Sequence, residues 1–148
     1  MRTLAIDLGT RRIGLAMSDE GGRFAMPFDV LEVTDPQQAI EPIVALIRKE
    51  AVQRVIIGLP LNMEDASIGP AARSVILWSG RLAMKVAIPI LYVDERLSSF
   101  QAEQDLIDEK RAGQHLTRGM KKERLDAQAA AVFLQEFLDG KLQPIELG

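Results

Sequence analysis

The order of short apolar runs along the chain limits the possible folds more than any other feature. Three strand-type runs fall within the first 33 residues with only short turns between them, and strand-type runs then alternate with helical patterns. The predicted strands are Leu4–Leu8, Ile13–Ser18, Phe28–Val33, Arg54–Leu59 and Ile90–Val93. The predicted helices run over about 37–50, 70–85, from Ser98 or Ser99 to Lys110, and 123–138. This order predicts an α/β fold with a mixed central sheet flanked by helices.

The first two strands have the spacing of a hairpin. Arg11 and Arg12 form a tight turn between them, which favours antiparallel pairing. Three antiparallel strands followed by a βαβα succession match an RNase H-like fold. With 148 residues and no internal repeat or linker, we expect a single domain over 1–148.

Composition excludes several kinds of site. The chain has no cysteine and one histidine, His115, so disulfide frameworks, thiolate zinc sites, cysteine nucleophiles and multi-histidine metal sites are ruled out. The apolar stretches are only a few residues long, and Asp7 interrupts the N-terminal run where a signal peptide needs an unbroken apolar core. We therefore expect no membrane association and a cytoplasmic protein whose chemistry depends on carboxylates, backbone groups or basic side chains.

A basic segment lies at about 110–122 in a chain whose net charge is −3. Six Lys or Arg residues stand against two Glu between positions 109 and 124. Such a local field can bind phosphates even on an acidic chain, because association depends on local charge more than on the total. A solvated loop explains the same run, and whether the segment is mobile is left open.

Asp7 is the first candidate site residue. Strand alternation places it on the same face as Ala5 and Thr3, and the next strand offers the small residues Gly14 and Ala16. A buried carboxylate needs a cation as its partner. That partner is either a metal ion or an arginine of the adjacent turn, Arg11 or Arg12.

Asp94, Glu95 and Arg96 follow the apolar strand that ends at Val93. In α/β sheets, ligands bind at the carboxyl ends of parallel strands. Because adjacent residues point to opposite faces, only one of the two acids can join a site on a given side. Asp94 could instead cap the following helix, and Arg96 could either hold a phosphate or neutralise its neighbours.

Asp126 shows the clearest residue-level signal. At 100° per residue, Ala130, Phe133 and Phe137 lie within about 40° of it on the helix, so Asp126 belongs to the apolar stripe that faces the protein. A position in the first helical turn also suits an acid for the helix dipole, but the dipole does not explain this choice of face. Three inward or strand-end carboxylates indicate oxygen-only coordination of a hard divalent ion, as in metal-assisted phosphodiester hydrolysis.

Four motifs along the chain together resemble the RuvX (YqgF) family of Holliday-junction-resolvase-like proteins, whose members are named as pre-16S rRNA nucleases. They cover residues 6–19, which begin Ile6-Asp7-Leu8-Gly9-Thr10, and residues 125–130, which begin Leu125-Asp126-Ala127-Gln128. The other two are Gly58-Leu59-Pro60-Leu61-Asn62-Met63 and Asp94-Glu95-Arg96-Leu97-Ser98-Ser99. The resemblance implies an RNase H-like fold and a carboxylate site at Asp7, Glu95 and Asp126 that binds Mg²⁺ or Mn²⁺. It also implies a role in maturing the 5′ end of 16S ribosomal RNA.

Two positions depart from the family pattern. Relatives usually carry a glycine soon after the Asn-Met pair, whereas this chain continues Glu64-Asp65-Ala66-Ser67, which leaves the loop conformation open. Ser99 stands where the family often has threonine.

The main hypothesis is a metal-dependent nuclease. Phosphate contacts orient a nucleic acid without reading its sequence, and the candidates for them are Arg11, Arg12, Arg96, Arg118, Lys121 and Lys122. Alternatives are a DNA resolvase of the Holliday-junction type and a non-catalytic RNA-binding ribosome-assembly factor. An ATPase is disfavoured because the chain lacks a Gly-x₄-Gly-Lys-[Ser/Thr] loop and has only one domain. The sequence does not decide whether the chain forms a homodimer.

Overall fold

The computed structural model describes residues 1–98 and 118–146, and it describes side chains for 1–98 and 126–146. Its elements are β1 (Thr3–Leu8), β2 (Arg12–Ser18), β3 (Ala25–Glu32), the 3₁₀ turn η1 (Pro36–Ala39), α1 (Ile40–Lys49), β4 (Arg54–Leu59), α2 (Pro70–Ala83), β5 (Ile90–Asp94), the 3₁₀ turn η2 (Glu95–Leu97) and α4 (Arg118–Leu138). The strands form one sheet in the order β3-β2-β1-β4-β5. β1 pairs antiparallel with β2 and parallel with β4, so the predicted mixed sheet and its hairpin are confirmed.

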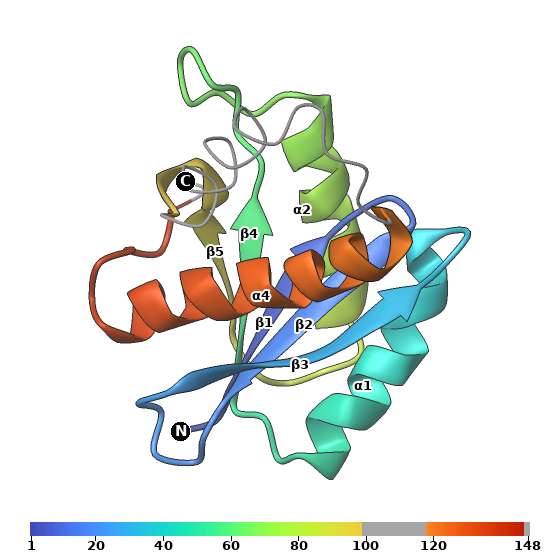
Figure 1. The fold of residues 1–148 in the computed structure, drawn as a ribbon, viewed down its shortest axis with the longest axis vertical. Coiled ribbons are helices and arrows are strands. Elements are labelled where there is room, and N and C mark those ends of the chain that lie inside the picture. Colours follow the sequence, from blue (N-terminus) through green and yellow to red (C-terminus); the bar gives the residue numbers. More distant parts are fainter. Residues whose placement is uncertain (99–117, 147–148) are drawn as a thin grey trace.

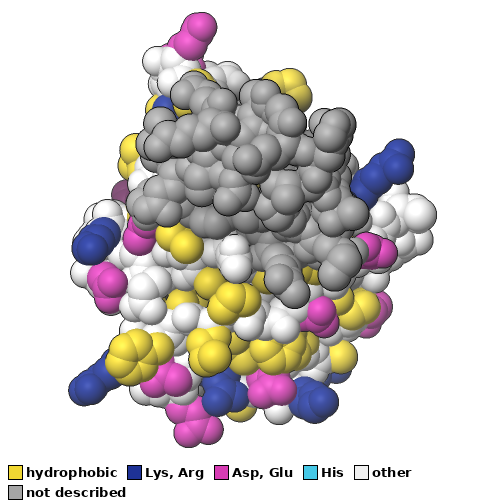
Figure 2. Space-filling model, in the orientation of Figure 1, with side chains coloured by type: hydrophobic (Ala, Val, Ile, Leu, Met, Phe, Trp, Pro, Cys, Tyr) yellow, Lys and Arg dark blue, Asp and Glu magenta, His cyan; other side chains and the backbone are white. Residues whose placement is uncertain are grey.

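Helices cover both faces of the sheet (Figure 1). One face packs on α1 and α2, around buried residues such as Ile43, Val75 and Trp78. The other face packs on α4, which crosses β1, β2 and β3 and buries Phe133 and Leu134 against the sheet. In Figure 2, which shows the α4 side, hydrophobic side chains gather in the lower part of the surface with charged groups around them.

Two boundaries differ from the prediction in the first half of the chain. β3 begins at Ala25, three residues early, and includes Pro27. Proline is tolerated there because β3 is an edge strand. The helix predicted from residue 37 starts as the 3₁₀ turn η1 and becomes α-helical only at Ile40. This places Pro42 in the first α-helical turn, where its missing N–H costs no hydrogen bond.

The second half contains one further difference. α4 begins at Arg118, five residues before the predicted start, so the basic residues Arg118, Lys121 and Lys122 are helical rather than part of a loop. The helix ends as predicted at Leu138, and Gly140 just after it has φ +78°. The helix predicted to start at Ser98 or Ser99 lies outside the described residues, apart from Ser98, which is extended. Among the described residues, no helix combines the length and the apolar character needed to cross a membrane.

Candidate active site

Asp7 lies near the carboxyl end of β1, in the middle of the sheet. Its Cα is paired with that of Gly14 on the antiparallel neighbour β2. The turn after β1 is closed by a hydrogen bond in which the Gly9 N–H donates to the Arg12 carbonyl at 3.0 Å. Asp7 therefore projects from a central strand, half-buried, beside the turn that carries Arg11 and Arg12.

Glu95 rather than Asp94 faces Asp7. Asp94 is buried and accepts hydrogen bonds from the backbone N–H of Arg96 at 3.1 Å and from Nη2 of its guanidinium at 2.6 Å. Asp94 therefore caps η2 and is neutralised by Arg96. Glu95 points to the other side, over Gly58 of β4, where an added Cβ would lie only 2.8 Å from Glu95 Oε2. The Glu95 side chain fits there because Gly58 has no side chain.

Asp126 reaches the sheet because α4 comes unusually close to β2. A Cβ at Gly14 would lie 2.1 Å from the Asp126 carbonyl oxygen, so only glycine permits this approach. Gly14 is one of the small residues that the sequence places beside Asp7, and α4 occupies the space that its missing side chain leaves. The Asp126 carboxylate is half-buried and forms an ion pair with Arg12, with Nε 3.2 Å from Oδ2.

The three acids influence one another electrostatically. Burial, and then the charges of Glu95 and Asp126, raise the pKa of Asp7 to about 7. Burial and the neighbouring Asp94 also raise the pKa of Glu95. Three carboxylates from three separate elements thus create a region of negative potential that a cation would stabilise.

The partner of Arg12 differs from one alternative suggested by the sequence. Arg12 pairs with Asp126 and not with Asp7. Within the described part of the chain, no three Asp, Glu or His side chains are grouped closely enough to form a ready metal site. The acids are therefore near enough to shift a pKa, but a metal ion held by all three requires their side chains to draw closer together.

The predicted phosphate-binding residues fall into three groups. Arg11 is exposed in the β1–β2 turn. Arg96 is largely engaged, because besides Asp94 it donates to the carbonyls of Asn62 and Met63 at 3.2 and 3.4 Å. Arg118, Lys121 and Lys122 belong to the first turns of α4, and His115 lies outside the described residues.

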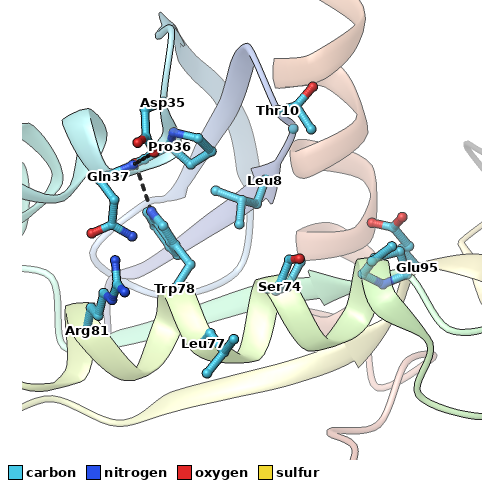
Figure 3. Close-up of a pocket in the computed structure, with 14 residues that line it drawn as sticks. Leu8, Thr10, Asp35, Pro36, Gln37, Ser74, Leu77, Trp78, Arg81 and Glu95 are labelled. Atoms are coloured by element: carbon cyan, nitrogen blue, oxygen red, sulfur yellow. Dashed lines mark hydrogen bonds between the residues drawn. The ribbon is translucent and has the colours of Figure 1, made fainter.

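The structure also shows residues that the sequence reasoning did not single out. Gly58 belongs to a family-like motif, yet its contact with Glu95 depends on how β4 and η2 meet and leaves no local pattern. A cavity of about 490 Å³ opens beside Glu95, lined by the turn after β1, by η1 and by α2 (Figure 3). Trp78 is buried and also forms part of the cavity wall.

Sequence comparison decides the family. The model of the family described as "RuvX: Holliday junction resolvase" matches residues 1–140. The chain belongs to the RuvX family. Relatives named "Putative pre-16S rRNA nuclease" include one from an Anaeromyxobacter species, 41% identical over 95% of this chain and 98% of its own length. Another, from Rhizobium rhizogenes, is 41% identical over 90% of this chain and 78% of its own length.

Solved structures agree with the RuvX family at the level of the fold. RuvC of T. thermophilus, in complex with a Holliday junction, has a TM-score of 0.59 at 13% identity and covers 98% of this chain and 100% of its own. Fowlpox virus resolvase has a TM-score of 0.52 at 8% identity over 93% of this chain and 99% of its own. The predicted RNase H-like fold is thus confirmed. Family and fold together support a nuclease that hydrolyses phosphodiester bonds.

Proposed function

We propose that this RuvX-family chain is a divalent-metal-dependent nuclease that processes the precursor of 16S rRNA, with Asp7, Glu95 and Asp126 as the metal-binding carboxylates. The main support is geometric: Gly14, the strand partner of Asp7, lies against the Asp126 backbone, and Glu95 lies over Gly58 of the strand next to β1. The raised pKa of Asp7, caused by burial and then by the charges of Glu95 and Asp126, agrees with this arrangement. Coupling of this kind within a cleft is typical of functional sites. β1, η2 and α4 contribute one acid each.

The donor chemistry fits a hard divalent cation. All three side chains offer carboxylate oxygens, which Mg²⁺ and Mn²⁺ prefer. A bound ion of this type supplies activated water and charge stabilisation for the leaving oxygen. The positive charge would also favour the ionised form of Asp7, whereas burial alone favours the protonated form.

Arg12 has a defined part in this proposal. Its guanidinium neutralises Asp126 through the 3.2 Å ion pair. A cation held by the acids would replace Arg12 as the counter-charge of Asp126, and Arg12 would then be available to contact a phosphate of the substrate at the edge of the site. Arg11, exposed in the same turn, and Arg118, Lys121 and Lys122 at the start of α4 would add further phosphate contacts.

The choice of RNA rests on the named relatives. Relatives at 41% identity that cover nearly the whole chain carry the pre-16S rRNA nuclease name. RuvC in complex with a Holliday junction is only 13% identical in sequence, so its similarity to this chain concerns the fold. We accordingly propose precursor rRNA as the substrate and the cytoplasm as the site of action, and we treat branched DNA as the competing substrate.

Cleavage assays test this function directly. The purified protein is incubated with a 5′-extended 16S rRNA precursor and with a four-way DNA junction, each with Mg²⁺, Mn²⁺ or EDTA. We expect metal-dependent RNA cleavage that is lost in Asp7→Asn and Asp126→Asn and retained in Asp139→Asn, an exposed acid in the turn that directly follows the helix of Asp126.

Each other outcome has a definite meaning. Cutting of the junction alone would move the assignment to a DNA resolvase. Binding of RNA by wild type and both site variants, with no cleavage under any metal, would replace the nuclease by a non-catalytic assembly factor.

A further inference from the structure

The cavity beside Glu95 has the size and position of a substrate pocket. Its volume of about 490 Å³ falls within the range of small-molecule sites. Glu95 and the Leu8-Gly9-Thr10 turn, which directly follows Asp7, form one end (Figure 3). The cavity is therefore continuous with the carboxylate cluster.

The inner wall is apolar and rigid. The Trp78 side chain is only 3% exposed, and its indole Nε1–H donates to the Pro36 carbonyl at 2.9 Å, which holds the ring in place. Trp78 and Val75, each 3% exposed, form the floor of the cavity. The apolar surface that a ligand can reach comes from the half-buried Leu8, Pro36 and Pro60 and from Leu77, which is 66% exposed. Such a surface suits a flat, largely uncharged ring, because the ring loses little hydration by entering and the wall needs no reordering.

Polar groups and charge are distributed along the cavity. Gln37 and Ser74 also line it, and Arg81 lies at the end away from Glu95 (Figure 3). Ser74 and Arg81 are separated by about 10 Å along α2, from a rise of about 1.5 Å per residue. A second cavity of about 330 Å³ shares Gln37 and Arg81 and continues to Lys85, which is paired with Glu41. Lys85 is thus neutralised, and Arg81 provides the positive charge at the end of the groove away from Glu95.

We propose that this groove binds an unpaired nucleotide of single-stranded RNA next to the bond that is cut. The base lies against the apolar wall, the amide of Gln37 meets its polar edge, and Arg81 binds a phosphate farther along the strand. A base within a duplex cannot reach such a wall, so the groove selects single-stranded RNA at this position. This inference rests on the proposed function, because the three acids define where the strand is cut.

Two substitutions alter the groove without touching the acids. Ser74→Tyr places an aromatic ring in the cavity from an exposed helical position, and Ala83→Tyr adds the same ring at an exposed position of α2 outside it. Arg81→Gln removes the cation of the groove, and Arg73→Gln removes an exposed cation of the same helix that does not line it. We expect Ser74→Tyr and Arg81→Gln each to lower kcat/KM on the RNA about tenfold, and both controls to behave like wild type.

Abasic substrates test the base contact itself. Single abasic nucleotides are placed at each of the three positions on either side of the cut. In wild type and Ala83→Tyr, one abasic position should lower kcat/KM about tenfold, and in Ser74→Tyr the same position should have little further effect. Equal sensitivity of wild type and Ser74→Tyr at every position would overturn the proposal and leave the nuclease assignment intact.

Binding separates failure of this inference from failure of the proposed function. The affinity for a fluorescent single-stranded RNA of the same sequence is measured by anisotropy in EDTA. If no cleavage occurs, weaker binding by Ser74→Tyr and Arg81→Gln than by their controls would still support the groove. Unchanged binding by these two variants, no binding by wild type, or equal affinity for the matching RNA duplex would overturn it.

Discussion

At the residue scale, Asp7 makes the site sensitive to pH. Its folded-state pKa of about 7 lies above the ordinary value of 3.8, so it holds a proton through much of the range in which most carboxylates are ionised. A cation must displace that proton. We expect the apparent dissociation constant for Mg²⁺ to rise by up to about tenfold for each pH unit below 7 and to be constant above pH 7. A pH-independent constant between pH 5.5 and 8.5 would contradict this.

The same shift has a consequence for stability. Because the folded state keeps the proton that the unfolded chain releases, the free energy of unfolding falls as pH rises from about 4 to 7. Asp7→Asn lacks this fall and should be more stable than wild type at pH 8, by about 1–3 kcal/mol after solvent screening. The difference should disappear near pH 4. Urea denaturation at both pH values measures it, and a constant difference would contradict the predicted linkage.

Ala66 adopts a backbone conformation that favours glycine, in the loop where this chain lacks the glycine of the family pattern. It lies in the loop where relatives usually have a glycine, and it adopts φ +58°, in the left-handed region that favours glycine. Ala51, which follows α1, has φ +53°. The loop keeps its turn, with the Ala66 N–H donating to the Asn62 carbonyl at 3.0 Å, at the cost of backbone strain.

We expect Ala66→Gly and Ala51→Gly each to raise the free energy of unfolding by about 1 kcal/mol. Ala45→Gly, at an exposed position within α1, should lower it by about as much. Thermal denaturation of the three variants provides the test. Destabilisation by all three would show that positions 51 and 66 are not strained.

At the element scale, the contact between α4 and β2 controls the geometry of the site. Gly14 brings the two backbones together, and an added Cβ would lie 2.1 and 2.3 Å from the carbonyl oxygen and carbon of Asp126. Backbone atoms cannot move aside as a flexible side chain can. Gly14→Ala therefore requires α4 to shift as a unit, and Asp126 shifts with it.

We expect Gly14→Ala to cost about 2–3 kcal/mol of stability and to abolish cleavage. Gly80→Ala is the matched control, because Gly80 is exposed within α2 and a Cβ there meets nothing within 4 Å. That control should gain about 0.5–1 kcal/mol and retain activity. Full activity of a folded Gly14→Ala variant would show that cleavage does not depend on the close contact between α4 and β2.

Element boundaries followed local patterns only where no long-range contact intervened. β4 matches its predicted bounds, since a short run rich in valine and isoleucine forms a buried strand wherever it lies. β3 began early because its place at the sheet edge permits Pro27, and edge position is a property of the whole sheet. The α1 prediction was wrong in its first turn, because η1 keeps Pro42 out of the helix interior.

At the scale of the whole molecule, a bound cation should stabilise the fold. The acids come from β1, η2 and α4, so an ion held by all three links both ends of the chain to the sheet. Mg²⁺ at about 100 times its dissociation constant should add about 2.7 kcal/mol. For a chain of this size, this raises Tm by about 5–10 °C at pH 8.

The Tm shift should vanish in Asp7→Asn and in Asp126→Asn and persist in Asp139→Asn. Differential scanning calorimetry with and without Mg²⁺ measures it. An equal shift in all four proteins would place the bound ion elsewhere and remove the support for this carboxylate site.

The sequence by itself determined the five strands and the three longer helices that the structure describes, apart from some of their ends. It also determined the absence of cysteine chemistry and the inward face of Asp126, because periodicity and composition are local properties. Only the tertiary structure decided that Glu95 and not Asp94 faces Asp7, since Arg96 binds Asp94 and Gly58 leaves space for Glu95. It also decided that Arg12 pairs with Asp126, and that a groove opens between η1 and α2. These features join residues up to 114 positions apart, and their proximity follows from strand order and helix docking, which no local pattern contains.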